Sequence, residues 1–373
     1  MRARRRLAAI LFTGLLVLTA CGTQQQSAST GGLPGQPADD ATVQEKLDWL
    51  AESGLEGDER RAFLVEQAAA DGPVVLYGSL NESLMNDWQA RLSEEFPELE
   101  IQILRLQEGY ERIRAESDAG QPVASVHDAD PQGMALFLTE AEGLLASYHS
   151  PAIEGLDLAP GVEHSEGLYT VHSAQPMVAV YNTELLTEDE VPDTLEELAE
   201  SDIPWARSRF GARWFAAMTE ALGEEEANRL IDLFDEQNPL VLDSNSGMRE
   251  AVIVGQVPLG VDTQLSGVKL AKEEGAPLEW HIINPPFTDV GSVAILSDAP
   301  NPYGAVLIYD WILEADGGQQ NFIGDTLGIR SDMDYELEGF EEFVTEAVGY
   351  TPELLINSGR FDQLWEDRFV RGD

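Results

Sequence analysis

Short apolar runs alternate with helix-periodic segments along most of the chain. Residues 73–77 form an apolar run that predicts a buried strand, and residues 84–96 repeat apolar positions at helical spacing. The further predicted strands are 99–104, 123–126, 177–181 and 258–261, and the further predicted helices are 43–50, 60–68, 110–119, 194–200 and 224–237. Strands that alternate with helices predict an α/β protein with mainly parallel sheets.

The N-terminal residues have the pattern of a targeting signal. Four arginines precede an apolar run at 7–20 that is too short to span a bilayer comfortably. Small residues then lead into Cys21, an arrangement that resembles the bacterial lipoprotein cleavage box, where the cysteine is acylated and becomes the new N-terminus. We therefore expect a lipoprotein signal peptide at 1–21, a lipid anchor at Cys21 and a flexible tether at 22–40. A chance cysteine after an ordinary secretory signal is the alternative.

The charge of the chain restricts its partners. It has 22 Lys+Arg against 68 Asp+Glu, a formal net charge of −46. Such a field repels phosphate backbones, so no nucleic-acid partner is expected. Only Lys46, Lys269 and Lys272 are lysines, and an acid-rich, lysine-poor surface keeps a protein soluble in concentrated salt. We expect a halophilic or salt-tolerant source, with a merely acidic surface as the alternative.

Several blocks between about residues 60 and 334 are similar, in this order, to the extracellular solute-binding proteins of ABC importers, in the subgroup that includes the ferric-iron binders. The blocks are 64–77, 143–148, 180–186, 191–198, 275–280, 299–305, 309–313 and 317–320. The resemblance implies a two-lobed type II periplasmic-binding-protein-like fold, in which two α/β lobes are joined by two hinge crossings. A ligand binds in the cleft between the lobes, where strands end and helix N-termini point.

The resemblance also implies an organisation and a set of partners. N-terminal helices are expected at 41–70, a first lobe at 71–173, a second lobe at 174–286, and a return to the first lobe followed by C-terminal helices at 287–373. The protein is then a monomer held by lipid on the outer face of the cytoplasmic membrane, periplasmic if the source has an outer membrane. It would deliver a small molecule or ion to the permease and ATPase of an ABC importer.

Three candidate ligand-binding residues fall in the expected first lobe. Ser79 and Asn81 lie where the first strand meets its helix, and they face either a ligand or the helix N-terminus as caps. Asp130 belongs to the stretch 127–130, which reads His-Asp-Ala-Asp and describes either a metal-binding turn or a solvated one.

Three more candidates fall in the expected second lobe. Arg209 lies in a loop that opens onto the cleft in the family, where it either clamps a carboxylate or phosphate or pairs with a surface acid. Ser246 lies in a polar, glycine-containing stretch that is either a cleft loop or a capped turn. Asp262 lies where the iron binders place adjacent tyrosines, and residues 260–266 contain no tyrosine pair.

The absence of a tyrosine pair at 260–266 decides between the candidate ligands. Without phenolate ligands a bare Fe³⁺ site loses its main support, so we expect a small organic or oxyanion ligand, or chelated iron, and no resident cofactor. Tyr181, Tyr303 and Tyr309 lie in apolar contexts that predict core positions. Free ferric iron is the first alternative. A secreted hydrolase is the second, although no nucleophile elbow, zinc helix or glycine-rich phosphate loop is present, so the chain is not expected to be an enzyme.

Overall fold

The computed structural model describes residues 33–106, 109–158, 161–209, 211–323, 326–335, 347–357 and 359–370. The expected signal peptide, Cys21 and most of the expected tether lie outside these residues. The chain divides into one unit at Met1–Gln36 and a second at Pro37–Asp373. In the first unit the Gln36 N–H donates to the Leu33 carbonyl at 3.0 Å. All of the architecture described below belongs to the second unit.

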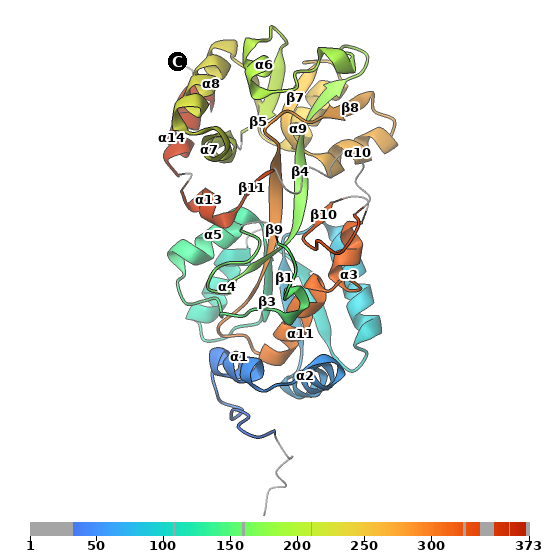
Figure 1. The fold of residues 1–373 in the computed structure, drawn as a ribbon, viewed down its shortest axis with the longest axis vertical. Coiled ribbons are helices and arrows are strands. Elements are labelled where there is room, and N and C mark those ends of the chain that lie inside the picture. The colour runs from blue at the N-terminus through green and yellow to red at the C-terminus, as the bar shows by residue number, and fades with distance from the viewer. Residues whose placement is uncertain are drawn as a thin grey trace, which may run out of the picture. The chain divides into compact units, whose positions relative to one another are not determined.

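The second unit consists of two lobes that share one sheet (Figure 1). Strands of the first lobe are β1 (Val74–Gly78), β2 (Ile101–Arg105) and β3 (Val126–Ala129), and those of the second are β5 (Trp205–Ser208), β6 (Leu240–Leu242), β7 (Leu259–Gln264) and β8 (Leu278–His281). Two longer strands, β4 (Thr170–Asn182) and β9 (Phe287–Ile295), run through both lobes. The short strands β10 (Leu327–Gly328) and β11 (Val348–Tyr350) pair with β4 and β9.

The main strand order is β2-β1-β3-β9-β4-β7-β5-β6. Within each lobe the predicted parallel pairing is present, because β1 is parallel to β2 and β3, and β5 is parallel to β6 and β7. The crossing strands β4 and β9 are antiparallel to each other and to β7 and β3. The predicted two-lobed α/β fold with two crossings is confirmed. The expected boundaries at 173/174 and 286/287 fall inside β4 and at the start of β9.

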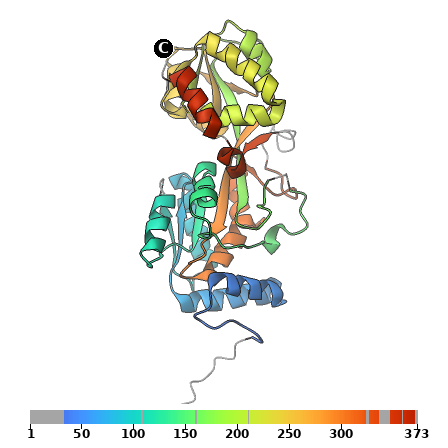
Figure 2. The ribbon, with the colours of Figure 1, turned by 90° about the vertical axis from the view of Figure 1, so that its left-hand side faces the viewer.

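Helices cover both lobes (Figure 2). Those of the first lobe are α1 (Val43–Glu52), α2 (Gly57–Asp71), α3 (Glu82–Glu95), α4 (Gly109–Asp118), α5 (Pro131–Glu140) and α11 (Pro302–Leu313). Those of the second are α6 (Leu195–Glu200), α7 (Gly211–Leu222), α8 (Glu224–Gln237), α9 (Asn245–Ile253) and α10 (Leu265–Glu273). Short 3-10 segments are η1 (Pro151–Ile153), η2 (Glu188–Glu190) and η3 (Gly318–Phe322). None of the helices in the described parts of the chain is long and apolar enough to cross a membrane.

The C-terminal segment returns along the crossing and ends on the second lobe. It contains β11, α13 (Pro352–Ile356), α14 (Gly359–Trp365) and the π-helical η4 (Glu366–Val370). Helix α13 packs against α5 of the first lobe and α7 of the second, and α14 packs against α7. The segment therefore contacts both lobes, through α13 and α14 (Figures 1 and 2).

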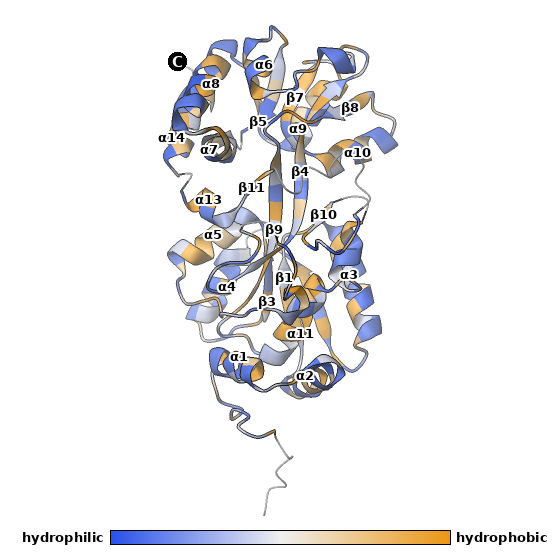
Figure 3. Cartoon of the chain, viewed as in Figure 1, coloured by the Kyte–Doolittle hydropathy of each residue, from blue (hydrophilic) through white to orange (hydrophobic). Residues whose placement is uncertain are grey.

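Apolar side chains at the predicted positions form the core. Every residue of helix α11 is buried, and Figure 3 shows hydrophobic segments along it. The Trp88 ring packs edge to face against the rings of Trp311 and Phe322. Tyr181, Tyr303 and Tyr309 are buried as predicted, with relative exposures of 4%, 3% and 1%.

Candidate functional site

A hollow of about 810 Å³ lies between the two lobes, and we call it the interlobe hollow. Its lining comes from both lobes, the crossing strand β9 and the C-terminal segment. The polar lining residues are Asp130, Gln132, Thr139, Arg209, Arg213, Asn245, Gln264, Asp289, Asp362 and Glu366. A smaller hollow of about 240 Å³ shares Asp130, Gln132 and Leu136 with it and extends into the first lobe toward Ser79 and His127. Residues far apart in sequence thus converge on one space where strands end.

The second lobe contributes the basic wall. Arg209 follows β5, where its N–H donates to the Leu242 carbonyl at 2.8 Å, and its side chain is exposed in the hollow. Arg213, on the first turn of α7, donates from Nη1 to Asp289 Oδ2 at 3.3 Å. Burial alone would lower the pKa of Arg213, but the carboxylates of Asp289 and Asp262 outweigh it and raise the pKa above its usual range. The guanidinium therefore stays charged at the floor of the hollow.

A polar chain continues from this arginine along the wall. Gln264, at the end of β7, donates from Nε2 to the same Asp289 Oδ2 at 3.4 Å. Asn245, the first residue of α9, donates from Nδ2 to Gln264 Oε1 at 2.9 Å. Among the described residues Asn245 Oδ1 and Asp289 Oδ1 are shielded from water and accept no hydrogen bond. The floor of the hollow therefore holds two acceptors that the described parts of the chain do not satisfy.

Asp289 lies where β9 crosses between the lobes. The Asp289 side chain has a relative solvent exposure of 18%. Burial raises the pKa of its carboxyl group, the Arg213 charge opposes that effect, and the charges of Asp130 and Asp262 add to it. Because Asp130 belongs to the first lobe and Asp262 to the second, the carboxylate of Asp289 senses charges from both.

The first lobe contributes Asp130 to the opposite wall. Its Oδ1 accepts the Gly133 N–H at 2.7 Å and caps α5, whose first residue is Pro131. A proline at this position has no N–H to satisfy, so one carboxylate oxygen is sufficient for the cap. The side chain is exposed and lines both hollows, which leaves its second oxygen available to a ligand.

The other members of the stretch 127–130 point to separate partners. His127 is buried and its Nδ1 lies 2.9 Å from the Tyr77 carbonyl; burial lowers its pKa, so the ring is neutral. Asp128 is buried, accepts the Ser79 N–H at 2.8 Å and lies 2.7 Å from His172 Nε2. In the described ranges no group of three or more His, Cys, Asp or Glu side chains could hold a metal ion.

Of the predicted site residues, Arg209 and Asp130 line the interlobe hollow from opposite lobes, and Ser79 lines the smaller one. The Ser79 N–H and hydroxyl both bond Asp128, which holds the turn after β1 in place. Asn81 is a helix cap, the alternative that its position left open, because its Oδ1 accepts the Leu84 N–H at 2.9 Å. Ser246 is exposed on α9 and accepts a hydrogen bond from Arg249 Nη2 at 3.3 Å. It does not line the hollow.

Asp262 requires a correction. It has a relative exposure of 5% and does not line the hollow. Its Oδ2 accepts from Arg207 Nη2 at 2.9 Å, and its Oδ1 accepts from the Tyr350 hydroxyl. The Arg207 guanidinium in turn lies 4.2 Å from the centre of the Trp214 ring. A charged arginine buried at this point requires a carboxylate partner, so Asp262 supports the wall behind the hollow instead of reaching a ligand.

Sequence reasoning missed Arg213, Asp289 and the C-terminal lining residues. Arg213 sits inside a largely apolar helix, and Asp289 is the one charged residue of strand β9. A charge within an apolar run was the available signal, since such a residue needs a partner when the element is buried. The residues Leu355 to Glu366 that line the hollow lie beyond the similar blocks, so no family pattern pointed to them.

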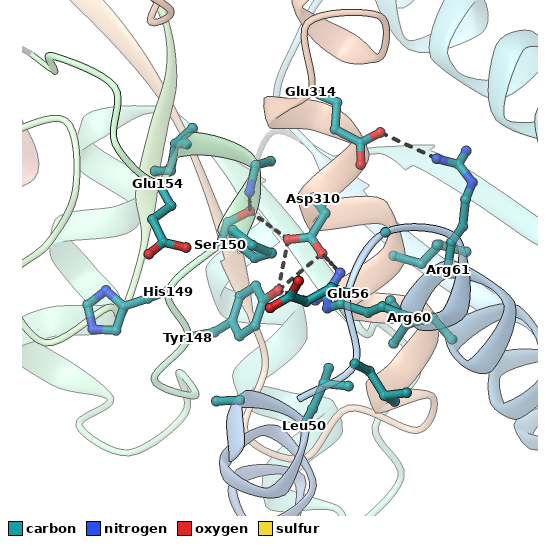
Figure 4. A pocket seen from close by; sticks show the side chains of 18 of the residues that line it. Leu50, Glu56, Arg60, Arg61, Tyr148, His149, Ser150, Glu154, Asp310 and Glu314 are labelled. Carbon is teal, nitrogen blue, oxygen red and sulfur yellow. Dashed lines mark hydrogen bonds and ion pairs between the residues drawn. The ribbon is translucent and has the colours of Figure 1, made fainter. Parts of the chain in front are cut away.

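A second, larger hollow of about 1110 Å³ lies at the end of the first lobe beside α1 and α2 (Figure 4). Four side chains converge there: Arg60 lies 2.6 Å from Asp310, while Tyr148 and Ser150 donate to the same carboxylate at 2.8 and 2.6 Å. Burial raises the pKa of Tyr148 well above its usual value, so its hydroxyl remains a donor. These polar groups satisfy one another, and they tie α2 and the segment at 148–150 to α11.

Comparison with known proteins places the chain in context. No protein-family model matches it. It is 26% identical over 212 residues, 54% of the chain and 59% of the relative, to an Fe(3+)-binding periplasmic protein of Serratia marcescens. The aligned part therefore spans about three fifths of that relative's length.

Two solved structures have similar folds. Iron-bound HitA from Pseudomonas aeruginosa has a TM-score of 0.66 at 18% identity, covering 80% of this chain and 100% of its own. The periplasmic binding protein AfuA from Actinobacillus pleuropneumoniae, with exogenous fructose-6-phosphate bound, has a TM-score of 0.64 at 19% identity, covering 81% and 99%. The resemblance read from the sequence is confirmed at the level of fold: the chain has the two-lobed fold of the periplasmic binding proteins.

Proposed function

We propose that the chain is a solute-binding protein that captures a small ligand outside the cytoplasm and delivers it to an ABC importer. The observation that supports this most is the interlobe hollow, whose polar lining comes from both lobes and from the strand that crosses between them. In a two-lobed protein a ligand that contacts both walls favours the closed arrangement, because it binds that arrangement better than the open one. The closed form would then be the one presented to the permease and ATPase.

The ligand we favour is a small organic or oxyanion ligand, or iron already held by a chelator. Arg209 and Arg213 provide donors for an anionic group, and guanidinium groups match carboxylate and phosphate oxygens in geometry. Free ferric iron is less favoured. Tyr181, Tyr303 and Tyr309 are buried in the core, and the hydroxyl of Tyr350 is engaged by Asp262.

The anchor and the surroundings are also part of the proposal. Acylation of Cys21 would hold the folded unit on the outer face of the membrane, with the residues after it as a tether. The charge of −46 suits a salt-rich medium, where counterions screen the repulsion between carboxylates.

A ligand screen by thermal shift tests this function. The mature chain would be tested at low and at multimolar NaCl with ferric citrate, phosphate, phosphonates, thiamine, small sugars and polyamines. A ligand at about 100 times its Kd stabilises the folded state by about 2.7 kcal/mol, which moves the melting temperature by a few degrees. Stabilisation by at least one of these small ligands is expected. No stabilisation by any of them at either salt concentration would contradict the proposed function.

A further inference from the structure

Charges of opposite sign are separated across the interlobe hollow. Both lining arginines, Arg209 and Arg213, belong to the second lobe. The lining acids come from the first lobe at Asp130, from the crossing strand at Asp289, and from the C-terminal segment at Asp362 and Glu366. Among the described residues that line the hollow, acids therefore outnumber arginines. A ligand with only negative charge would add to this excess of negative charge.

The two unsatisfied acceptors belong to the second lobe, at Asn245, and to the crossing strand, at Asp289. The amide of Asn245 has its orientation set by the chain of hydrogen bonds: Gln264 uses Nε2 toward Asp289, so its Oε1 must accept, and Asn245 must offer Nδ2 to it. The oxygen of Asn245 is thereby left without a donor, as is Oδ1 of Asp289. Buried acceptors favour any ligand that brings hydrogen-bond donors to them.

Asp289 also restricts which donor fits. Its carboxylate lies 3.3 Å from Arg213, so an anionic group bound at that arginine is also close to a negative charge. The Asp289 side chain is 18% exposed and lines the hollow, so a ligand there lies close to the carboxylate. An ammonium group offers three donors and a positive charge, whereas a hydroxyl offers one donor and no charge. The positive charge of an ammonium group would offset the negative charges of Asp289 and Asp130.

We infer that the ligand of the interlobe hollow is zwitterionic, with an anionic group on the Arg209 and Arg213 wall and an ammonium group toward Asp289, Asp130 and the Asn245 oxygen. This inference rests on the proposed function and narrows its ligand class. It makes Asp289 the residue that discriminates between ligands with the same anionic group.

Matched ligands test the inference by isothermal titration calorimetry on the mature chain. The phosphate series is O-phosphoethanolamine, 2-hydroxyethyl phosphate and ethyl phosphate, which differ only in the terminal group. The carboxylate series is 3-aminopropanoate, 3-hydroxypropanoate and propanoate. In at least one series the ammonium ligand should bind at least about tenfold more tightly than both of its partners, the low end for a charged hydrogen bond.

Two variants test whether Asp289 is the residue that causes the preference for the ammonium ligand. Asp289→Asn keeps the side chain's size and removes its charge, so it should weaken the ammonium ligand at least about tenfold and leave the ligand without a terminal donor unchanged or tighter. Asp189→Asn, an exposed aspartate on η2, is the matched control and should change neither. A melting curve of each variant confirms that it folds.

Each other result overturns the inference. Equal binding within a series would show a small-ligand site that ignores the ammonium group, which leaves the proposed function intact. Tightest binding by the hydroxyl ligand would make the site one for polar anions without positive charge. Equal weakening of all ligands by Asp289→Asn would make Asp289 a structural residue. No binding in either series would exclude short zwitterions, while the wider screen above would still decide the proposed function.

Discussion

The buried pair of Arg207 and Asp262 offers the sharpest test of the structure behind the site. The Arg207 side chain has no exposure and that of Asp262 has 2%. Substituting Asp262→Asn removes the charge while keeping the side chain's size, and asparagine tolerates the positive φ of 65° at this position. The guanidinium would then be buried without a carboxylate, in contact with the Trp214 and Trp365 rings. We expect a loss of about 3 kcal/mol in unfolding free energy, the low end for breaking a buried pair.

Urea unfolding followed by tryptophan fluorescence, at one fixed NaCl concentration, measures this loss. Glu224→Gln is the matched control, because Glu224 pairs with Arg360 on the surface with side-chain exposures of 67% and 55%. Its effect should stay within about 0.5 kcal/mol. The double variant Arg207→Met with Asp262→Asn leaves no unpaired charge and should recover most of the stability. A loss under about 0.5 kcal/mol for Asp262→Asn alone would refute the reasoning and reopen a ligand role for Asp262.

Three further predictions concern charge, anchoring and iron. The melting temperature should rise between about 0.05 and 2 M NaCl, because the Debye length falls from about 10 Å at 0.1 M to about 3 Å at 1 M and screens the carboxylates; a flat profile in differential scanning calorimetry would contradict a halophilic origin. Cys21→Ser should move the protein out of the membrane fraction of cells, and unchanged retention would exclude acylation at that residue. Adding ferric iron without a chelator should give no visible phenolate charge-transfer band, since Tyr303 and Tyr309 are buried in α11 and Tyr350 is bonded to Asp262; a coloured complex would return bare iron to first place.

Local pattern was sufficient for much of the fold. The helix predicted at 224–237 has those bounds in α8, because its apolar positions repeat at helical spacing and Gly223 precedes it. Asp130 was singled out as part of a possible metal-binding turn, and Arg209 because it lies in a loop that opens onto the cleft in the similar family. In the structure each of the two residues directly follows a strand, β3 and β5.

Long-range pairing explains what sequence reasoning missed. Asp262 had the residue type and position of a ligand contact, but its partner Tyr350 lies 88 residues further along the chain. No local pattern shows that a C-terminal tyrosine returns beside β9 to meet it. Asp289 likewise owes its importance to the crossing of the lobes, which brings Asp130 and Arg213 near it from different lobes.

Titration calorimetry on variants of both walls tests the central claim, that a small ligand is bound between the lobes, most directly. The ligand with the largest thermal shift in the screen would be titrated into the wild type, Arg209→Ala and Asp130→Asn, the last chosen because asparagine still caps α5. Arg229→Ala, on the surface of α8, is the control. If that ligand carries an anionic group, Arg209→Ala should cost about 1.5–3 kcal/mol of binding free energy, and Asp130→Asn should also weaken binding while the control does not. Unchanged affinity in both wall variants would contradict binding between the lobes.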